Sequence, residues 1–141
     1  MKIILASKSG VRKQILDSHK IECDVIVSNV DEDEVKYSLI AEGADPSLIS
    51  KNLAEIKSIK VSNKNPNRLV LGADSVISLN NKLINKPKSR EEALEILKKL
   101  NNSKHFLISS VCISKNGAMV WHYTDTSELK MKNFSTQQLS N

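Results

Sequence analysis

Two short, wholly apolar runs, residues 3–6 and 69–73, constrain the fold of this chain more than any other feature. Continuous apolar runs of this length are typical of strands that are buried on both faces of a sheet. Such a sheet needs helices across its faces. Helical patterns follow the first run at residues 11–16 and precede the second run at residues 46–59. The sequence therefore predicts an α/β fold.

Local signals place the starts of the other helices. Acidic residues suit the positive end of a helix dipole, Asp before Pro is a typical start, and Ser-x-x-Glu forms a capping box. These three signals occur at residues 31–34, 45–46 and 89–92. In the helix that begins at Pro46, the apolar spacing predicts a buried stripe of Ile49, Leu53, Ile56 and Ile59.

The later strands are expected to pair as antiparallel hairpins. Turn residues at 80–81 and 115–117 separate segments of β-like sequence, and the last of these segments covers residues 118–124. A further strand is expected at residues 24–28, and Trp121 and Tyr123 are expected to be packing residues. Together these elements predict a mixed, twisted sheet flanked by helices in a single domain that spans residues 1–141.

Composition argues against several classes of protein. Only two cysteines are present, which argues against a disulfide scaffold or a Cys-rich zinc module. No apolar run approaches the ~20 residues of a membrane span or suits a leader peptide, so we expect a cytoplasmic protein with no membrane partner. The net charge of +5 favours anionic partners, namely nucleotides, nucleic acid or acidic lipid. Aromatic residues make up only 4% of the chain, so a base-stacking surface for nucleic acid is poorly supported.

Two segments contain residues that suit phosphate or metal chemistry. At a strand-to-helix junction, Ser7, Ser9 and Arg12 combine hydroxyl groups, a cation and free backbone N–H groups, as a phosphate needs. The alternative is a capped turn with a solvated Arg12. Asp74 directly follows an apolar strand, where a carboxylate can serve as a base or a metal ligand, or can simply cap a turn.

Other charged residues are compatible with the same chemistry. The acidic run at residues 31–34 can hold a hard divalent cation, although such a run is more often a solvated face. Lys57 lies beside the apolar helix stripe, and Lys86 follows a predicted hairpin. Each lysine can contact a phosphate or can simply be solvated.

Taken together and in this order, the motifs resemble the Maf family of nucleoside triphosphate pyrophosphatases. The resemblance covers essentially the whole chain, and it is specific because five weak motifs occur in register. These motifs are Ser7-x-Ser9-x-x-Arg12, Asp31-Glu32, Leu53-Ala54-x-x-Lys57, Gly72-x-Asp74 and Lys86-Pro87.

The resemblance implies a fold like that of Maf and inosine triphosphatase (ITPase) proteins, and hydrolysis of the α–β phosphoanhydride of modified or non-standard nucleotides. It makes Asp74 the proton acceptor and gives Glu32 and Asp74 a divalent metal, Mg²⁺ or Mn²⁺. Val11 and Ser75 occupy the positions implicated in the choice of base, and a homodimer is implied. The residues that the resemblance assigns to phosphate binding are Ser7, Ser9, Arg12, Lys57 and Lys86.

Two alternatives to an active enzyme are open at this point. Members of the family continue past the C-terminus of this chain, and residues 135–141 look like the start of a helix. The first alternative is therefore a truncated, inactive remnant that at most binds nucleotides. The second is a nucleic-acid-binding module, which the positive charge suggests but which no basic stripe or known reader motif supports.

Overall fold

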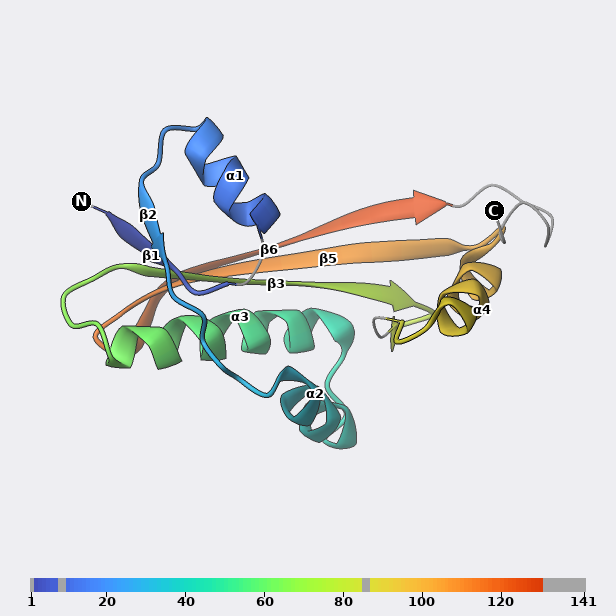
Figure 1. The fold of residues 1–141 in the computed structure, drawn as a ribbon. Coiled ribbons are helices and arrows are strands. Elements are labelled where there is room, and N and C mark those ends of the chain that lie inside the picture. The colour runs from blue at the N-terminus through green and yellow to red at the C-terminus, as the bar shows by residue number, and fades with distance from the viewer. Residues whose placement is uncertain (1, 8–9, 85–86, 131–141) are drawn as a thin grey trace.

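A mixed sheet with helices on both faces forms the body of the molecule (Figure 1). The structure is a computed structural model, and it describes residues 2–7, 10–84 and 87–130. The helices are α1 (Gly10–Ser18), α2 (Glu32–Ala41), α3 (Pro46–Asn63) and α4 (Arg90–Leu100). The strands are β1 (Ile3–Leu5), β2 (Cys23–Val25), β3 (Val70–Leu79), β4 (Lys82–Ile84), β5 (Lys104–Lys115) and β6 (Ala118–Lys130).

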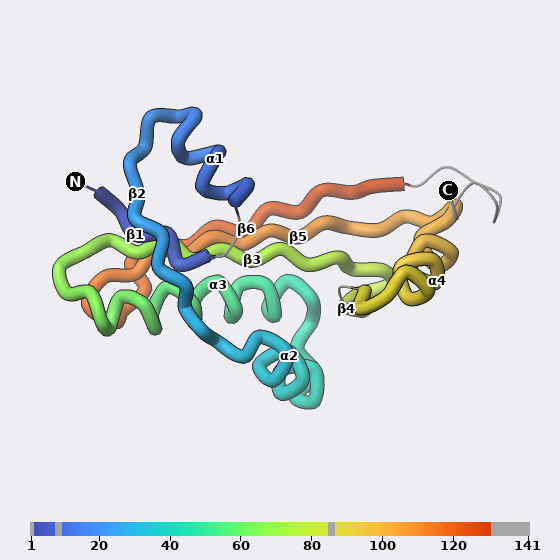
Figure 2. Tube along the Cα trace, viewed as in Figure 1, coloured from blue at the N-terminus to red at the C-terminus, as the bar shows by residue number. Residues whose placement is uncertain are grey.

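The strands are ordered β2-β1-β3-β5-β6, and β4 pairs with the end of β3 (Figure 2). Strand β1 runs parallel to both β2 and β3, whereas β3, β5 and β6 pair antiparallel. The parallel part contains β2 and the two apolar runs, which form β1 and the start of β3. The antiparallel part contains the β3–β4 and β5–β6 hairpins and the pairing of β3 with β5. The predicted α/β architecture with a mixed sheet is confirmed.

Helix α3 packs along one face of the sheet, and α1 lies over the opposite face (Figure 1). The start of α3 is as predicted, because the Asp45 carboxylate accepts a hydrogen bond of 2.8 Å from the Leu48 N–H and Pro46 occupies the first turn. The predicted stripe is partly wrong: Ile49 and Leu53 are buried, but Ile56 is 37% exposed.

Small and hydroxyl-bearing residues complete the buried face of α3 in place of Ile56. This face includes Ser50, Ala54, Ser58 and Ser62, all fully buried. Buried hydroxyl groups need hydrogen-bond partners, and that of Ser58 lies 2.7 Å from the hydroxyl of Ser114 on β5. Small side chains allow the backbone of α3 to approach the sheet more closely than a face of isoleucines would permit.

The closest approach of α3 to the sheet is at Gly72 on β3. A Cβ atom at this position would overlap the carbonyl oxygen of Ala54 and would lie 2.9 Å from the Cβ of Ser58. Only a glycine fits here without displacing the helix. The glycine therefore determines the distance between α3 and β3. This distance in turn decides which side chains of α3 are long enough to contact those of β3.

Strand boundaries differ from the predictions in ways that matter for the site. Strand β3 continues through Asp74, so the prediction that Asp74 follows the end of a strand is wrong. Strand β1 is short and its pairing with β3 ends at Leu71, so the edge of β3 at Asp74 is not covered by β1. Strand β2 is shorter than predicted and β6 is longer.

The aromatic residues of β6 are not buried. Trp121 is 50% exposed and Tyr123 is 55% exposed, and their rings stack on each other with centroids 6.3 Å apart. The prediction that they serve as packing residues is therefore wrong.

The helix start expected at residues 135–141 lies outside the described residues. Within the described residues, no helix combines the length and the apolar character that crossing a membrane requires.

We predict that Gly72→Ala lowers the free energy of unfolding by about 1–3 kcal/mol, because the added methyl group forces α3 away from β3. The matched control is Gly10→Ala, since a Cβ at Gly10 would meet nothing within 4 Å and alanine favours a helix. Denaturant unfolding of both variants measures the difference. Equal stability of the two variants would contradict the close approach.

Candidate active site

Three charged side chains meet where β3 extends beyond the end of β1. The Nζ atom of Lys57 lies 2.6 Å from Oε1 of Glu32 and 3.2 Å from Oδ1 of Asp74. The same ammonium group donates a hydrogen bond of 3.2 Å to the carbonyl oxygen of Ala73. Lys57 and Asp74 are both buried, so this pair interacts in an environment that screens charge much less than water does.

Each member of this cluster is held by a different element of the fold. Lys57 lies on the buried face of α3, next to the close approach at Gly72. Asp74 lies within β3, and its carbonyl oxygen accepts a hydrogen bond of 3.1 Å from the Ser50 hydroxyl on α3. Glu32 is the first residue of α2, which the preceding Asp31 caps by accepting a hydrogen bond of 3.1 Å from the Glu34 N–H.

The loop that leads to Glu32 is also tied to α3. Asn29 adopts a positive φ of 55°, a conformation that asparagine tolerates better than most residues do. Its carbonyl oxygen accepts a hydrogen bond of 2.9 Å from Nζ of Lys60. Helix α3 therefore provides Lys57 and also holds the segment that delivers Glu32 to it.

The carboxyl group of Asp74 is only partly satisfied. Its Oδ2 atom is buried and has no hydrogen-bond partner among the described residues, whereas Oδ1 faces Lys57. Burial raises the pKa of Asp74 above its ordinary value, the positive charge of Lys57 opposes that rise, and the charge of Glu32 adds to it. A buried carboxylate with an unpartnered oxygen can accept a proton or bind a cation.

A second pair of predicted residues faces the same space. Arg12, on α1, donates a hydrogen bond of 2.8 Å from Nη1 to the hydroxyl of Ser7, in the segment that follows β1. A polar cavity of about 390 Å³ is lined by these two residues together with Glu32, Lys57 and Asp74. The structure thus brings these five predicted site residues together from the segment after β1 and from α1, α2, α3 and β3.

The structure describes two further predicted site residues, Ser75 and Val11. Ser75 also lines the polar cavity, and its side chain is exposed. Val11 is 65% exposed on α1 and does not line this cavity. Ser9 and Lys86 lie outside the described residues.

The carboxylates present suit a cation that is shared with a bound phosphate group. Within the described part of the chain, no cluster of three or more His, Cys, Asp or Glu residues could hold a metal ion alone. Mg²⁺, however, is usually bound by one or two carboxylates together with substrate phosphates and water. Asp74 offers its unpartnered Oδ2, and Glu32 lies beside the same lysine. The donor set therefore fits a divalent cation that arrives with its substrate.

A second cavity, of about 310 Å³, adjoins the polar one and shares Arg12, Asp74 and Ser75 with it. It lies between α1 and the sheet, and aliphatic side chains form most of its wall. Ser109 of β5 also lines it, opposite Ser75 in the strand register. Sequence motifs gave no indication of Ser109, because its position follows only from the pairing of two distant strands.

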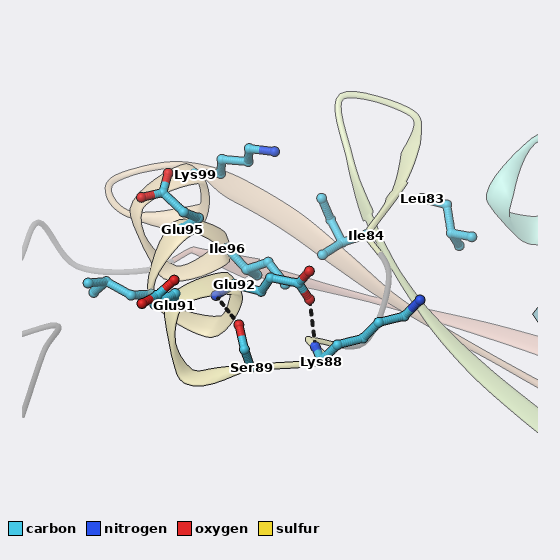
Figure 3. A pocket seen from close by; sticks show the side chains of 10 residues that line it. Leu83, Ile84, Lys88, Ser89, Glu91, Glu92, Glu95, Ile96 and Lys99 are labelled. Carbon is cyan, nitrogen blue, oxygen red and sulfur yellow. Dashed lines mark hydrogen bonds between the residues drawn. The ribbon is translucent and has the colours of Figure 1, made fainter.

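A larger cavity, of about 910 Å³, lies between β4 and α4, and none of the predicted site residues that the structure describes lines it (Figure 3). Aliphatic side chains of β4 and α4 line it, together with charged side chains of α4 and of Lys88, which precedes α4. Figure 3 also shows the predicted cap of α4: the Ser89 hydroxyl accepts a hydrogen bond of 3.1 Å from the Glu92 N–H. The Glu92 carboxylate accepts one of 2.6 Å from the Lys88 N–H. We place the candidate site at the smaller polar cavity, because the chemically reactive side chains converge there.

We predict that Asp74→Asn raises the melting temperature of the metal-free protein at neutral pH. The folded protein holds the Asp74 proton to a higher pH than the unfolded chain does, so stability falls as pH rises through the window above the ordinary Asp pKa. At neutral pH the ionised group is therefore destabilising, and asparagine mimics its neutral form.

Thermal melts in a metal chelator at several pH values test this prediction. The gain in melting temperature should shrink as the pH falls below about 4, where the wild-type carboxyl is protonated in both states. The exposed residue Asp33 provides the matched control, and Asp33→Asn should give no gain. A lower melting temperature for Asp74→Asn at neutral pH would contradict the account of its burial.

Solved structures of two other bacterial proteins have a fold similar to that of this chain. A HAM1 protein from Coxiella burnetii aligns with a TM-score of 0.54 over 91% of this chain and 72% of that protein, at 17% identity. A nucleoside-triphosphatase (dITP/XTP pyrophosphatase) from Mycobacterium abscessus aligns with a TM-score of 0.53 over the same shares, at 14% identity. These similarities confirm the predicted fold class, which is like that of Maf and ITPase proteins.

Sequence relatives are much closer. A protein named nucleoside triphosphate pyrophosphatase from Pelagibacter ubique is 59% identical over 99% of this chain and 71% of its own length. A 7-methyl-GTP pyrophosphatase from Brucella abortus is 34% identical over 94% of this chain and 66% of its own length. The model of the family described as Maf-like protein matches residues 2–141. On this evidence the chain belongs to the Maf-like protein family.

Proposed function

We propose that this chain is a nucleoside triphosphate pyrophosphatase, which hydrolyses the α–β phosphoanhydride of modified or non-standard nucleotides to a nucleoside monophosphate and pyrophosphate. The observation that carries the proposal is the buried carboxyl of Asp74, which has one oxygen without a partner among the described residues and which lines a cavity together with Lys57 and Arg12. The names of the relatives from Pelagibacter ubique and Brucella abortus support the same reaction class.

The cations of the polar cavity suit the phosphate chain of such a substrate. Phosphoryl chemistry depends mainly on positioning and on stabilising negative charge, so an arginine and a lysine at one cavity are the expected equipment. Arg12 is already oriented by its bond to Ser7, and Lys57 by Glu32 and Asp74. The motif match adds two further phosphate-binding residues to the proposal, namely Ser9 and Lys86.

Asp74 is proposed as the proton acceptor that activates the attacking water. A base must be ionised before the reaction, and burial alone would favour the neutral form. The neighbouring Lys57 counters burial, since its positive charge stabilises the ionised carboxylate. Lys57 therefore has two proposed roles, which are to contact the phosphates and to hold Asp74 in its active protonation state.

Divalent-metal dependence is the general expectation for this family, and we propose Mg²⁺ or Mn²⁺ for this chain. Glu32 and Asp74 would hold the ion together with the substrate phosphates. When bound, such an ion orients and acidifies water and neutralises phosphate charge. The unpartnered Oδ2 of Asp74 is the observation on this chain that supports the assignment.

The remaining parts of the proposal concern the substrate base and the setting. Val11 and Ser75 are proposed as specificity residues from their motif positions, and Ser75 lines both cavities at the candidate site. We propose a cytoplasmic location because nucleotide pools are found there. The homodimer implied by the family resemblance stays a prediction.

Pyrophosphate release from a panel of standard and modified nucleoside triphosphates, with Mg²⁺ or Mn²⁺, tests the proposed function. We expect Asp74→Asn to lower turnover by about 10²- to 10⁴-fold, the usual contribution of a general base. Asp33→Asn, which changes an exposed carboxylate of α2, should keep the wild-type rate within about twofold.

Two results would contradict this proposal in different ways. A wild-type rate in Asp74→Asn would show that another group accepts the proton. Absence of pyrophosphate from every nucleotide, in folded wild-type protein that still binds nucleotides, would favour the inactive remnant. The chain spans 71% of the length of its relative from Pelagibacter ubique.

A further inference from the structure

The cavity between α1 and the sheet has a chemical character different from that of the polar cavity beside it. Its walls are aliphatic on both sides: Ile15 and Leu16 extend from α1, and Leu71, Ala73 and Val111 belong to the sheet. It is adjacent to the polar cavity, because the two cavities share three lining residues, Arg12, Asp74 and Ser75. A single ligand with a charged end and an apolar end can therefore occupy both cavities.

A nucleotide has these two ends. Its phosphates suit the cations of the polar cavity, and its flat base suits a slot between aliphatic walls, provided that polar groups meet the edge of the base. In the apolar cavity, the hydroxyl groups of Ser75 and Ser109 provide such a polar feature. They lie 2.9 Å apart on neighbouring strands, where the two residues are directly opposed.

A hydrogen-bonded pair of hydroxyl groups is an adaptable partner for a base. Either serine can be the donor in the bond between them, so the pair keeps one O–H group and several lone pairs for a ligand. Reversing the direction of the bond moves the free O–H from one serine to the other. The pair can thus form a hydrogen bond with either a donor or an acceptor on the edge of a base. The free-energy cost of orienting the two hydroxyl groups differs from one base to another.

We propose that the apolar cavity takes the nucleobase and that Ser109, paired with Ser75, is a specificity-determining residue that reads its polar edge. This inference rests on the proposed function, and it adds a binding subsite and a residue on β5 to it. The neighbouring Ser110 does not have this role, because it is only 1% exposed, whereas Ser109 is half-buried and Ser75 is exposed.

The test compares wild-type protein with Ser109→Ala on ATP, GTP, CTP, UTP and 7-methyl-GTP. We measure kcat/KM for pyrophosphate release and, separately, Kd for the α,β-methylene analogues, which cannot be cleaved at that bond. Loss of one hydrogen bond to a base should change the ratio between the best and the worst nucleotide by about three- to tenfold.

The matched control is Ser127→Ala, which removes an exposed hydroxyl of β6 that lines neither cavity. Its selectivity should equal that of the wild type within about twofold, the scatter expected of a surface change. Melting temperatures of both variants show whether each remains folded.

The two readouts separate the inference from the proposed function. If Ser109→Ala changes the order of Kd values among the analogues, and neither protein releases pyrophosphate, the result would support the base subsite and contradict the pyrophosphatase activity. Unchanged ratios in Ser109→Ala by both measurements would overturn the role of Ser109. Equal binding of all analogues by the wild type, or binding of none, would overturn the subsite itself.

Discussion

The candidate site depends on the close packing of α3 against β3 at Gly72. Because this residue has no side chain, the backbone of α3 approaches the strand until Ala54 and Ser58 lie against it. Lys57, on the same helix face, is then near enough to reach Asp74 two residues further along β3. A helix held further away by ordinary aliphatic side chains would separate Lys57 from Asp74 and leave the charge of Asp74 buried without this partner, which is costly.

The charges in this cluster are arranged at the expense of stability. Asp74 is buried, and one of its oxygens is left without a partner among the described residues. Lys57 lowers the cost of the ionised carboxylate without removing it, since burial remains the dominant influence on the pKa of Asp74. Buried titratable groups with perturbed pKa values are common where a protein binds a charged ligand or transfers a proton, because such pKa values cluster at functional sites. The incomplete hydrogen bonding of Asp74 is thus better explained by a ligand than by folding.

Local chemistry predicted much of the fold, because helix starts and turns depend on a few neighbouring residues. Asp45 and Ser89 cap their helices as the sequence indicates. The buried face of α3 was not predictable in the same way. The close packing of α3 against Gly72 determines which residues of the helix face the sheet. The serines of α3 that face the sheet are therefore buried, and Ile56 is not. The position of Asp74 inside β3, likewise, follows from the pairing of β3 with the distant strand β5, which continues beyond the point where β1 ends.

The candidate site was predictable only through the order of its motifs. Ser7, Arg12, Glu32, Lys57 and Asp74 come from distant parts of the chain, and periodicity alone does not bring them together. Ser109 carries no local signal at all, since its place beside Ser75 arises from the pairing of β3 with β5. Family resemblance therefore predicted the charged residues of the polar cavity, whereas the apolar cavity beside it became apparent only from the structure.

A crystal structure of the protein with an α,β-methylene nucleoside triphosphate and Mg²⁺ tests the central claim most directly. The account predicts phosphates against Arg12 and Lys57, a cation on the free oxygen of Asp74, and the base between α1 and the sheet. A nucleotide bound elsewhere, for example in the larger cavity beside α4, would contradict it.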